Sequence, residues 1–303
     1  MKRIKKDKGV KYKSPKKKNF LKKHAMAPFL APSIIGVGLF FLLPFLVVIF
    51  YSFVDNPVTK EWVWFDNFVR LFKNNSFKRA VKNTFTFTGI AVPLALVLSL
   101  LLAMLLDQKL PGKSQFRTFF LSPMMVPIAS VVLIWQVLFH ENGAVNDFIA
   151  IFGADKIDWF KSDYAMIAIV PLFLWKNLGY NMILFMSALG SIPKDIIEVA
   201  QLDGANSWKI FWRIKLRYLS PTIVFVLIMS IINSFKVFRE VYLLTGDHPF
   251  PSLYMLQHYM NNMFKSLDYQ KLSAAAILMS LVMIVLIGAM FIVENHFGKD
   301  VEG

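Results

Sequence analysis

Long runs of apolar residues, separated by shorter charged segments, recur along the whole chain. A helix needs about 20 consecutive apolar residues to cross a bilayer, and six segments meet or approach that length. The predicted spans are about 25–54, 83–106, 118–139, 164–189, 218–238 and 272–293. Lys176 interrupts the fourth span and Lys236 lies near the end of the fifth. Six such runs argue against a soluble helical core, so the sequence predicts an all-α polytopic membrane protein.

Charge divides the chain into a basic tail and a membrane domain. Of the 303 residues, 56% are apolar and 17% are charged, and the formal charge is +15. The tail, residues 1–24, carries twelve Lys and Arg against one acid, so it holds +11 of that charge. We expect this tail to be disordered and to lie against anionic lipid rather than to bind nucleic acid. The transmembrane domain then covers residues 25–295, and a short second tail covers 296–303.

The basic residues also predict which way the chain faces. Lys and Arg are enriched in cytoplasmic segments, so the first tail is placed in the cytoplasm and six spans return the C-terminus there. The segment between the first two spans fits less well, because it is basic as well. It also carries Phe65, Phe68, Leu71 and Phe72, whose spacing predicts an amphipathic surface helix.

No catalytic or metal-binding pattern stands out. The chain has no cysteine, which excludes thiolate ligands and cysteine nucleophiles. No two of its five histidines have the i, i+4 spacing of a helical metal site. Gly112-Lys113-Ser114 matches the end of a phosphate-binding loop, but Asp107 stands where that loop requires glycine. The sequence therefore predicts a protein that is not an enzyme and has no metal or cofactor of its own.

The segment between the fourth and fifth spans, residues 190–217, predicts a helix, a turn and a second helix. Pro193 suits a helix start, and the acids after it lie near the positive end of the helix dipole. Asp203-Gly204 ends or turns that helix, and an amphipathic helix restarts around Trp208. Small residues would let another protein approach the backbone closely. On periodicity alone, an ordinary helix–turn–helix is favoured over a docking surface.

Polar side chains gather inside the fourth and fifth predicted spans. They are Trp175, Lys176, Asn177, Gly179, Tyr180 and Asn181 in the fourth, and Ser230, Asn233 and Ser234 in the fifth. Polar groups at bilayer depth are costly and usually face a bundle interior or a water-filled cavity. Two interpretations stay open. Either the groups make hydrogen bonds between helices, or they line a path where amides and hydroxyls bind a sugar and an aromatic ring covers it.

Segment 190–217 also resembles a known family. Glu198-Val199-Ala200, then Asp203-Gly204-Ala205 and Ile214-Lys215-Leu216, is similar to the EAA loop of permease subunits of binding-protein-dependent ABC importers. More narrowly, it resembles the maltose permease group. Residues 27–53, 234–238 and 242–246 extend the similarity along the chain. The chain departs from the pattern at Arg217, where a proline is usual, at Val199, which replaces an alanine, and after Gly246, where two glycines are missing.

The resemblance implies a cytoplasmic coupling helix that sits in a cleft of a separate ATPase subunit. It assigns coupling roles to Glu198, Ala200, Asp203, Gly204 and Ala205. The implied partners are a second homologous permease, two ATPase subunits that bind ATP and magnesium, and an extracytoplasmic substrate-binding protein. The implied location is the cytoplasmic (inner) membrane of a bacterium or archaeon, with many passes and both termini in the cytoplasm.

The same resemblance implies a sugar or oligosaccharide substrate. It places the sugar contacts in spans four and five, at Tyr180, Asn181, Ser230, Asn233 and Ser234, with Gly179 allowing close approach. Lys176 and Lys236 would pair with carboxylates of a partner or with an acidic sugar. A polyol or a glycerol phosphate is the alternative substrate. An ion-coupled secondary transporter would want carboxylates inside the membrane, and no Asp or Glu lies within a predicted span.

Overall fold

The computed structural model describes residues 29–108 and 111–297, with side chains up to residue 294. The predicted tail 1–24 and most of the predicted segment 296–303 lie outside these residues. The chain divides into two units, Met1–Phe50 and Tyr51–Gly303, and each is considered by itself. The described part is helical almost throughout, with one isolated β-bridge between Val54 and Trp62. An all-α fold is therefore confirmed.

The first unit contributes most of one long helix. This helix runs from Phe29 to Ser52 and is long and apolar enough to cross a membrane. Its middle turn, η1 (Gly38–Leu42), is a π-helical turn that leads into α2 (Leu43–Ser52). Pro44 lies two residues after this turn and cannot donate a backbone hydrogen bond, which accounts for the locally widened helix.

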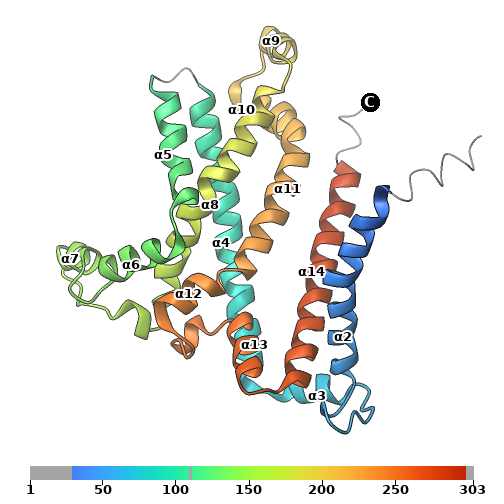
Figure 1. Cartoon of the computed structure of the whole chain (residues 1–303). Coiled ribbons are helices and arrows are strands. Elements are labelled where there is room, and N and C mark those ends of the chain that lie inside the picture. The colour runs from blue at the N-terminus through green and yellow to red at the C-terminus, as the bar shows by residue number, and fades with distance from the viewer. Residues whose placement is uncertain (1–28, 109–110, 298–303) are drawn as a thin grey trace, which may run out of the picture. The chain divides into compact units, whose positions relative to one another are not determined.

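The second unit is a helical bundle (Figure 1). In chain order its α-helices are α3 (Asp66–Lys73), α4 (Asn75–Asp107), α5 (Lys113–Met125), α6 (Ile128–Leu138), α7 (Ala144–Ala150), α8 (Ala165–Gly190), α9 (Lys194–Leu202), α10 (Ser207–Ile210), α11 (Leu216–Phe235), α12 (Phe238–Thr245), α13 (Leu256–Lys265) and α14 (Tyr269–Phe297). A π-helical turn, η3 (Phe211–Lys215), joins α10 to α11, and the short 3₁₀ turns η2 (Trp159–Lys161) and η4 (Pro251–Leu253) complete the set. The predicted surface helix is present as α3.

Five helices of the described residues are long and apolar enough to span a membrane, and a sixth span is formed if α5 and α6 count together. The third predicted span, 118–139, is therefore not one straight helix. It is bent by 100° between α5 and α6. Pro127 explains the break, because its ring disfavours a helical conformation at Val126 and it lacks the N–H that would continue the helix.

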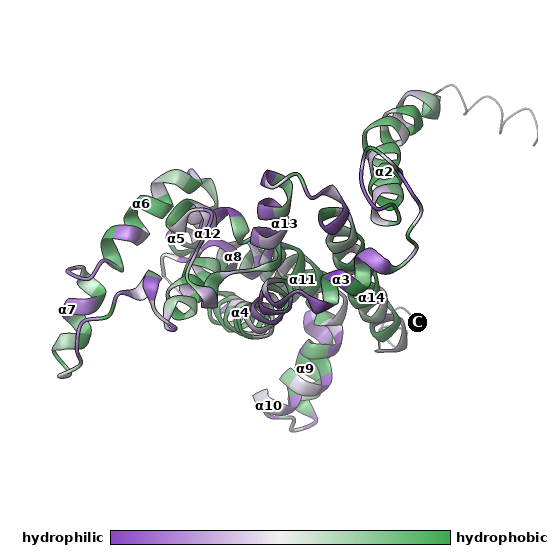
Figure 2. Cartoon of the chain, turned by 90° about the horizontal axis from the view of Figure 1, so that it is seen from below, coloured by the Kyte–Doolittle hydropathy of each residue, from purple (hydrophilic) through white to green (hydrophobic). Residues whose placement is uncertain are grey.

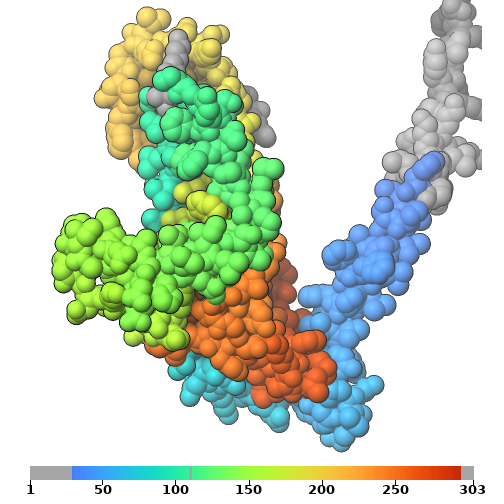
Figure 3. Space-filling view, turned by 60° about the vertical axis from the view of Figure 1, so that its left-hand side comes forward, coloured from blue at the N-terminus to red at the C-terminus, as the bar shows by residue number. Residues whose placement is uncertain are grey.

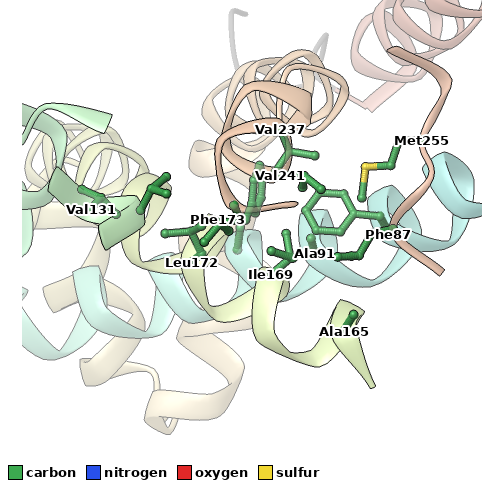
Figure 4. Packing of buried hydrophobic residues seen from close by; sticks show 14 residues of the cluster. Phe87, Ala91, Val131, Ala165, Ile169, Leu172, Phe173, Val237, Val241 and Met255 are labelled. Atoms are coloured by element: carbon green, nitrogen blue, oxygen red, sulfur yellow. The ribbon is translucent and has the colours of Figure 1, made fainter. Parts of the chain in front are cut away.

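Helix α4 packs closely on α8 and α11, which form the centre of the second unit. A row of small buried side chains on α4 permits this approach: Ala91, Ala95, Ser99 and Ala103. Figure 4 shows Phe87 and Ala91 of α4 meeting Ile169 and Phe173 of α8, with Val237 and Val241 above them. A second cluster of buried residues continues the same interface towards α9.

The crossing of α8 with α5 depends on one glycine. A Cβ placed on Gly179 would lie 1.8 Å from the carbonyl oxygen of Phe120. No larger residue fits without moving one of the two helices. Gly179, which the sequence singles out, therefore allows the backbones of α8 and α5 to come into close contact.

Both ends of the second unit differ from its apolar middle. In Figures 1 and 3 the segment α9–α10 stands at one end of the bundle, and α12 and α13 lie towards the other. Figure 2 shows hydrophilic residues on α7, α13 and the α9–α10 segment, while the long helices are mainly hydrophobic. This is the pattern expected when polar segments lie at the two surfaces of a membrane.

Candidate functional site

Four of the predicted path residues, Lys176, Asn177, Tyr180 and Asn233, line one cavity of about 430 Å³. It lies where α11 ends at Phe235 and α12 begins at Phe238, beside the middle of α8. Its polar and charged lining consists of Lys176, Asn177, Tyr180, Asn233, Lys236, Arg239 and Glu240. The volume lies within the range of about 300–1,000 Å³ that is usual for small-molecule sites.

Two amides in the cavity orient each other. The Asn233 side-chain N–H donates to Asn177 Oδ1 at 2.9 Å, and the Asn177 amide donates to the carbonyl oxygen of Phe173 at 2.8 Å. Asparagine amides have further donor and acceptor capacity beyond these bonds. Tyr180 follows Lys176 and Asn177 by about one turn on α8, so its ring lines the same cavity. These residues can therefore bind hydroxyl groups and cover an apolar ring face.

An ion pair joins α8 to α12 at this cavity. Lys176 Nζ lies 2.5 Å from Glu240 Oε1, and both side chains are largely buried. Arg239 Nη2 lies 3.7 Å from the same oxygen. Glu240 Oε2 is also buried and has no hydrogen-bond partner among the described residues. Lys176 thus pairs with a carboxylate of its own chain, whereas the sequence predicts a carboxylate of a partner or an acidic sugar.

Glu240 is the functional candidate that sequence reasoning missed. It lies two residues beyond the predicted end of the fifth span. The predicted spans therefore contain no Asp or Glu only because the predicted fifth span ends at residue 238. The signal was available, because Glu240 follows Lys236 by four residues directly after a long apolar run, where charged residues are uncommon. A buried carboxylate at this depth needs a nearby cation.

The other predicted path residues lie in contacts between helices. Asn181 donates to Ser230 Oγ at 3.1 Å, and both residues are buried. Ser234 Oγ lies 2.9 Å from Thr88 Oγ1 of α4. Trp175 lies against Trp135, with ring centroids 6.1 Å apart. These residues and Gly179 are outside the cavity, so the predicted set divides between cavity lining and helix packing.

Helix α9 forms a separate candidate site at the end of the bundle. It begins directly after Pro193, and none of its residues is buried. The backbone N–H of Ala205 donates to Ala200 O at 2.9 Å and that of Gly204 donates to Gln201 O at 3.0 Å, which closes the helix. Gly204 has φ +76°, a conformation that suits glycine. Ala200, Gly204 and Ala205 therefore already have a local structural role.

The exposed side of α9 carries apolar residues at three-residue spacing among charged ones. The exposed fractions are 57% for Val199 and 87% for Leu202, and Ile196 is exposed as well. Glu198 and Asp203 are exposed beside them. On another side of α9, Ile197 and Gln201 line a groove together with Leu105 of α4 and Phe211 of η3. The helix therefore contacts the ends of the membrane helices while presenting its other side outward.

A polar cluster lies near the opposite end of the unit. Lys265 Nζ lies 2.5 Å from Asp247 Oδ1, and this contact holds the pKa of Asp247 below its ordinary value. His258 of α13 is fully buried, and burial lowers its pKa from 6.5 to about 4, partly opposed by Asp247. Within the described residues, no three His, Cys, Asp or Glu side chains come together as a metal site.

Comparisons with known proteins agree with this architecture. Residues 95–303 match the family model "Binding-protein-dependent transport system inner membrane component". The probable ABC transporter permease protein YesP of Bacillus subtilis (strain 168) is 30% identical over 288 residues, 90% of each chain. The multiple sugar-binding transport system permease protein MsmF of Streptococcus mutans is 30% identical over 279 residues, 90% of this chain and 95% of its own.

A solved structure shows the same fold. It is a chain in the crystal structure of a bacterial alginate ABC transporter in complex with an alginate pentasaccharide-bound periplasmic protein. The TM-score is 0.79 at 23% identity, over 94% of this chain and 99% of the other. The resemblance of the chain to importer permeases is thus confirmed at the level of the family. The chain belongs to the binding-protein-dependent transport system inner membrane components.

Proposed function

We propose that this chain is the permease subunit of an ATP-driven importer for a sugar or oligosaccharide. The observation that carries the proposal is the polar cavity between α8 and the α11–α12 break, set within helices that are otherwise apolar. Family membership supplies the transport role. Relatives bearing the names of sugar systems, such as MsmF and the arabinooligosaccharide permease AraP of Bacillus subtilis, support the substrate class.

In this proposal the cavity holds the substrate during transport. Asn177 and Asn233 bind sugar hydroxyls with the hydrogen-bonding capacity that their mutual bond leaves free. Tyr180 covers the apolar face of the sugar ring. Asn181, Ser230 and Ser234 fix the helices that carry these groups, because their bonds run between helices.

The coupling role falls to α9. Its apolar residues Ile196, Val199 and Leu202 are left exposed by the part of the chain that the structure describes, and a cleft of a separate ATPase subunit would cover them. Glu198 and Asp203 would pair with basic groups there. The ATPase would bind ATP and magnesium, and this chain would perform no chemistry.

The complete importer would contain this chain, a second homologous permease, two ATPase subunits and an extracytoplasmic binding protein. ATP binding would draw α9 with the ATPase and shift the spans from an inward-facing to an outward-facing state. Such a shift requires that nucleotide bind the two states with different affinity. Both termini would lie in the cytoplasm. This orientation is favoured because the tail and the segment around α9 are basic, and the anionic lipid heads of the cytoplasmic leaflet attract basic segments.

A glycerol phosphate importer is the second candidate. The sn-glycerol-3-phosphate permease UgpA of Rhizobium meliloti is 29% identical over 279 residues, and cationic side chains line the cavity here. An ion-coupled secondary transporter has less support, because the family uses a binding protein.

The coupling proposal is tested by Gly204→Trp in the full complex reconstituted in vesicles with its loaded binding protein. The bulky ring should keep α9 from its cleft, so the variant should insert normally and lose ATP hydrolysis stimulated by the binding protein. Gly153→Trp is the matched control, since Gly153 has φ +78° and, like Gly204, has no neighbouring atom within 4 Å of an added Cβ. Stimulated hydrolysis that persists in Gly204→Trp at the control level would overturn the coupling role.

A further inference from the structure

Cationic side chains outnumber carboxylates around the cavity. Lys176, Lys236 and Arg239 line it together with one acid, Glu240, which leaves a surplus of two positive charges. Lys176 sits at the middle of α8, a helix long enough to cross the membrane. Charge at such depth is costly unless a partner compensates it. Glu240 compensates Lys176, so the surplus lies on Lys236 and Arg239, at the exposed side of the cavity.

Of the three cations, only Lys176 forms a close ion pair with Glu240. Lys176 Nζ lies 2.5 Å from Glu240 Oε1, whereas Arg239 lies 3.7 Å from the same oxygen and its side chain is 68% exposed. Lys236 is exposed and has no carboxylate within 4 Å among the described residues. Lys236 and Arg239 are thus available to a ligand, while Lys176 is held by Glu240.

We infer that the substrate of this permease is an anionic sugar or sugar derivative, whose carboxylate or phosphate is bound by Lys236 and Arg239. The inference rests on the proposed function and narrows its substrate class. The planar Arg239 guanidinium suits both oxyanions, because it can donate two parallel hydrogen bonds to either. Asn177, Asn233 and Tyr180 are left to bind the uncharged part of the molecule.

Glu240 gives the site its selectivity. Its carboxylate pairs with Lys176, the most buried of the three cations, before substrate arrives. Glu240 also lies 3.7 Å from Arg239 Nη2, so an anion must approach Arg239 from the exposed side of its guanidinium, away from this like charge. The anionic group is therefore held at the Lys236–Arg239 side, and the neutral part of the substrate lies towards Asn177 and Tyr180.

The substrate class is tested by import into cells that carry the complete transporter with its binding protein. The solutes form three arms: digalacturonate as a carboxylate, glycerol 3-phosphate and a sugar phosphate as phosphates, and matched neutral compounds that include the digalacturonate methyl ester, a disaccharide and a polyol. ATP-dependent depletion from the medium is measured by mass spectrometry. At least one anionic solute should be imported at least tenfold faster than its neutral counterpart. The carboxylate and phosphate arms distinguish the two sources of the anion.

The residues are tested by the double variant Lys236→Gln/Arg239→Gln. Both side chains are exposed, so their replacement should leave the inserted amount of protein unchanged. Since a hydrogen bond to a charged group stabilises a complex by roughly ten- to a hundredfold in affinity, import of the anion should fall by at least tenfold. Lys161→Gln is the matched control, because Lys161 is 82% exposed and lies outside the cavity. It should import at the rate of the unaltered chain.

Each contrary result has a distinct meaning. Import of neutral solutes at the same rate as anions, or unchanged anion import in the double variant, overturns the anionic substrate while the importer function stands. Absence of import in every arm overturns the anionic substrate and the proposed function together.

Discussion

Two regions of the molecule carry residues in unusual places. The cavity between α8 and α12 buries charged side chains, whereas the outer face of α9 exposes apolar ones. In the cavity, Lys176 of the long apolar helix α8 and Glu240 of α12 are both largely buried. On α9, which lies outside the helices long enough to span, Val199 and Leu202 are exposed. Both arrangements cost free energy in the isolated chain, since buried charges need compensation and exposed apolar patches lack cover.

The contrast shows what kind of ligand each region requires. A polar cavity in an apolar bundle suits a small polar molecule that replaces lost water contacts. An apolar face on a short polar segment suits a protein partner that covers it. Disturbing the first region should therefore change the stability of the fold, while disturbing the second should change only coupling to a partner.

The largest effect is expected from Glu240→Ala. This substitution leaves Lys176 buried without its carboxylate, and breaking a buried pair in this way costs about 3–5 kcal/mol. Thermal unfolding of the purified protein in detergent should show a strong decrease in stability.

The matched control is Lys176→Met/Glu240→Gln, which removes both charges together. Replacement of a buried pair by uncharged residues is often neutral, so this double variant should recover most of the lost stability. If Glu240→Ala unfolds at the temperature of the unaltered protein, the pair does not join α8 to α12 in the membrane-embedded fold.

Acidification should produce the next largest effect, through His258 in the packed part of the second unit. Burial lowers its pKa from 6.5 to about 4, so the unfolded chain takes up a proton at a pH where the folded chain does not. Stability from this group is present above pH 6.5 and is lost as pH falls towards 4, by up to about 3 kcal/mol. Unfolding measured across this range should show the decline.

His258→Gln should flatten that pH dependence, whereas His140→Gln should preserve it because His140 is exposed. An equal decline in the His258→Gln variant would assign the effect to other groups.

The smallest effect on stability is expected from Val199→Ser/Leu202→Ser on α9. Both side chains are exposed, so their replacement should alter the free energy of unfolding by less than about 0.5 kcal/mol. ATP hydrolysis stimulated by the loaded binding protein should nevertheless fall at least tenfold in the reconstituted complex. Normal hydrolysis, or a large loss of stability, would remove the contrast between the two regions.

The sequence predicts the helices well because their apolar runs are long and the membrane dictates their length. It also predicts the ends of α9, since Pro193 and Gly204 have conformational preferences that act locally. The break between α5 and α6 was missed because apolar residues continue through Val126 and Pro127, and hydropathy alone does not register a change of direction.

The cavity was only partly predictable, because the sequence does not show which face of a span meets which neighbour. Asn181 and Tyr180 are adjacent polar residues of one helix, yet Asn181 bonds to Ser230 and Tyr180 lines the cavity. Gly179 meets the backbone of α5, a contact fixed by the packing of two distant segments. Glu240 was missed because the break after Phe235 returns α12 towards α8, which places a residue beyond the predicted span beside Lys176.

The most direct test is whether the cavity lies on the transport path. The chain has no cysteine, so Met229→Cys places a single reactive thiol in the cavity lining, and Val285→Cys places one on an exposed apolar position of α14. The rate of reaction with a membrane-impermeant thiosulfonate is measured in the reconstituted complex, with and without the loaded binding protein and ATP. The cavity thiol should react from water, and transported substrate should slow its reaction severalfold, while the α14 thiol should stay unreactive. A Met229→Cys thiol whose reaction rate is the same with and without substrate would contradict the placement of the transport path in this cavity.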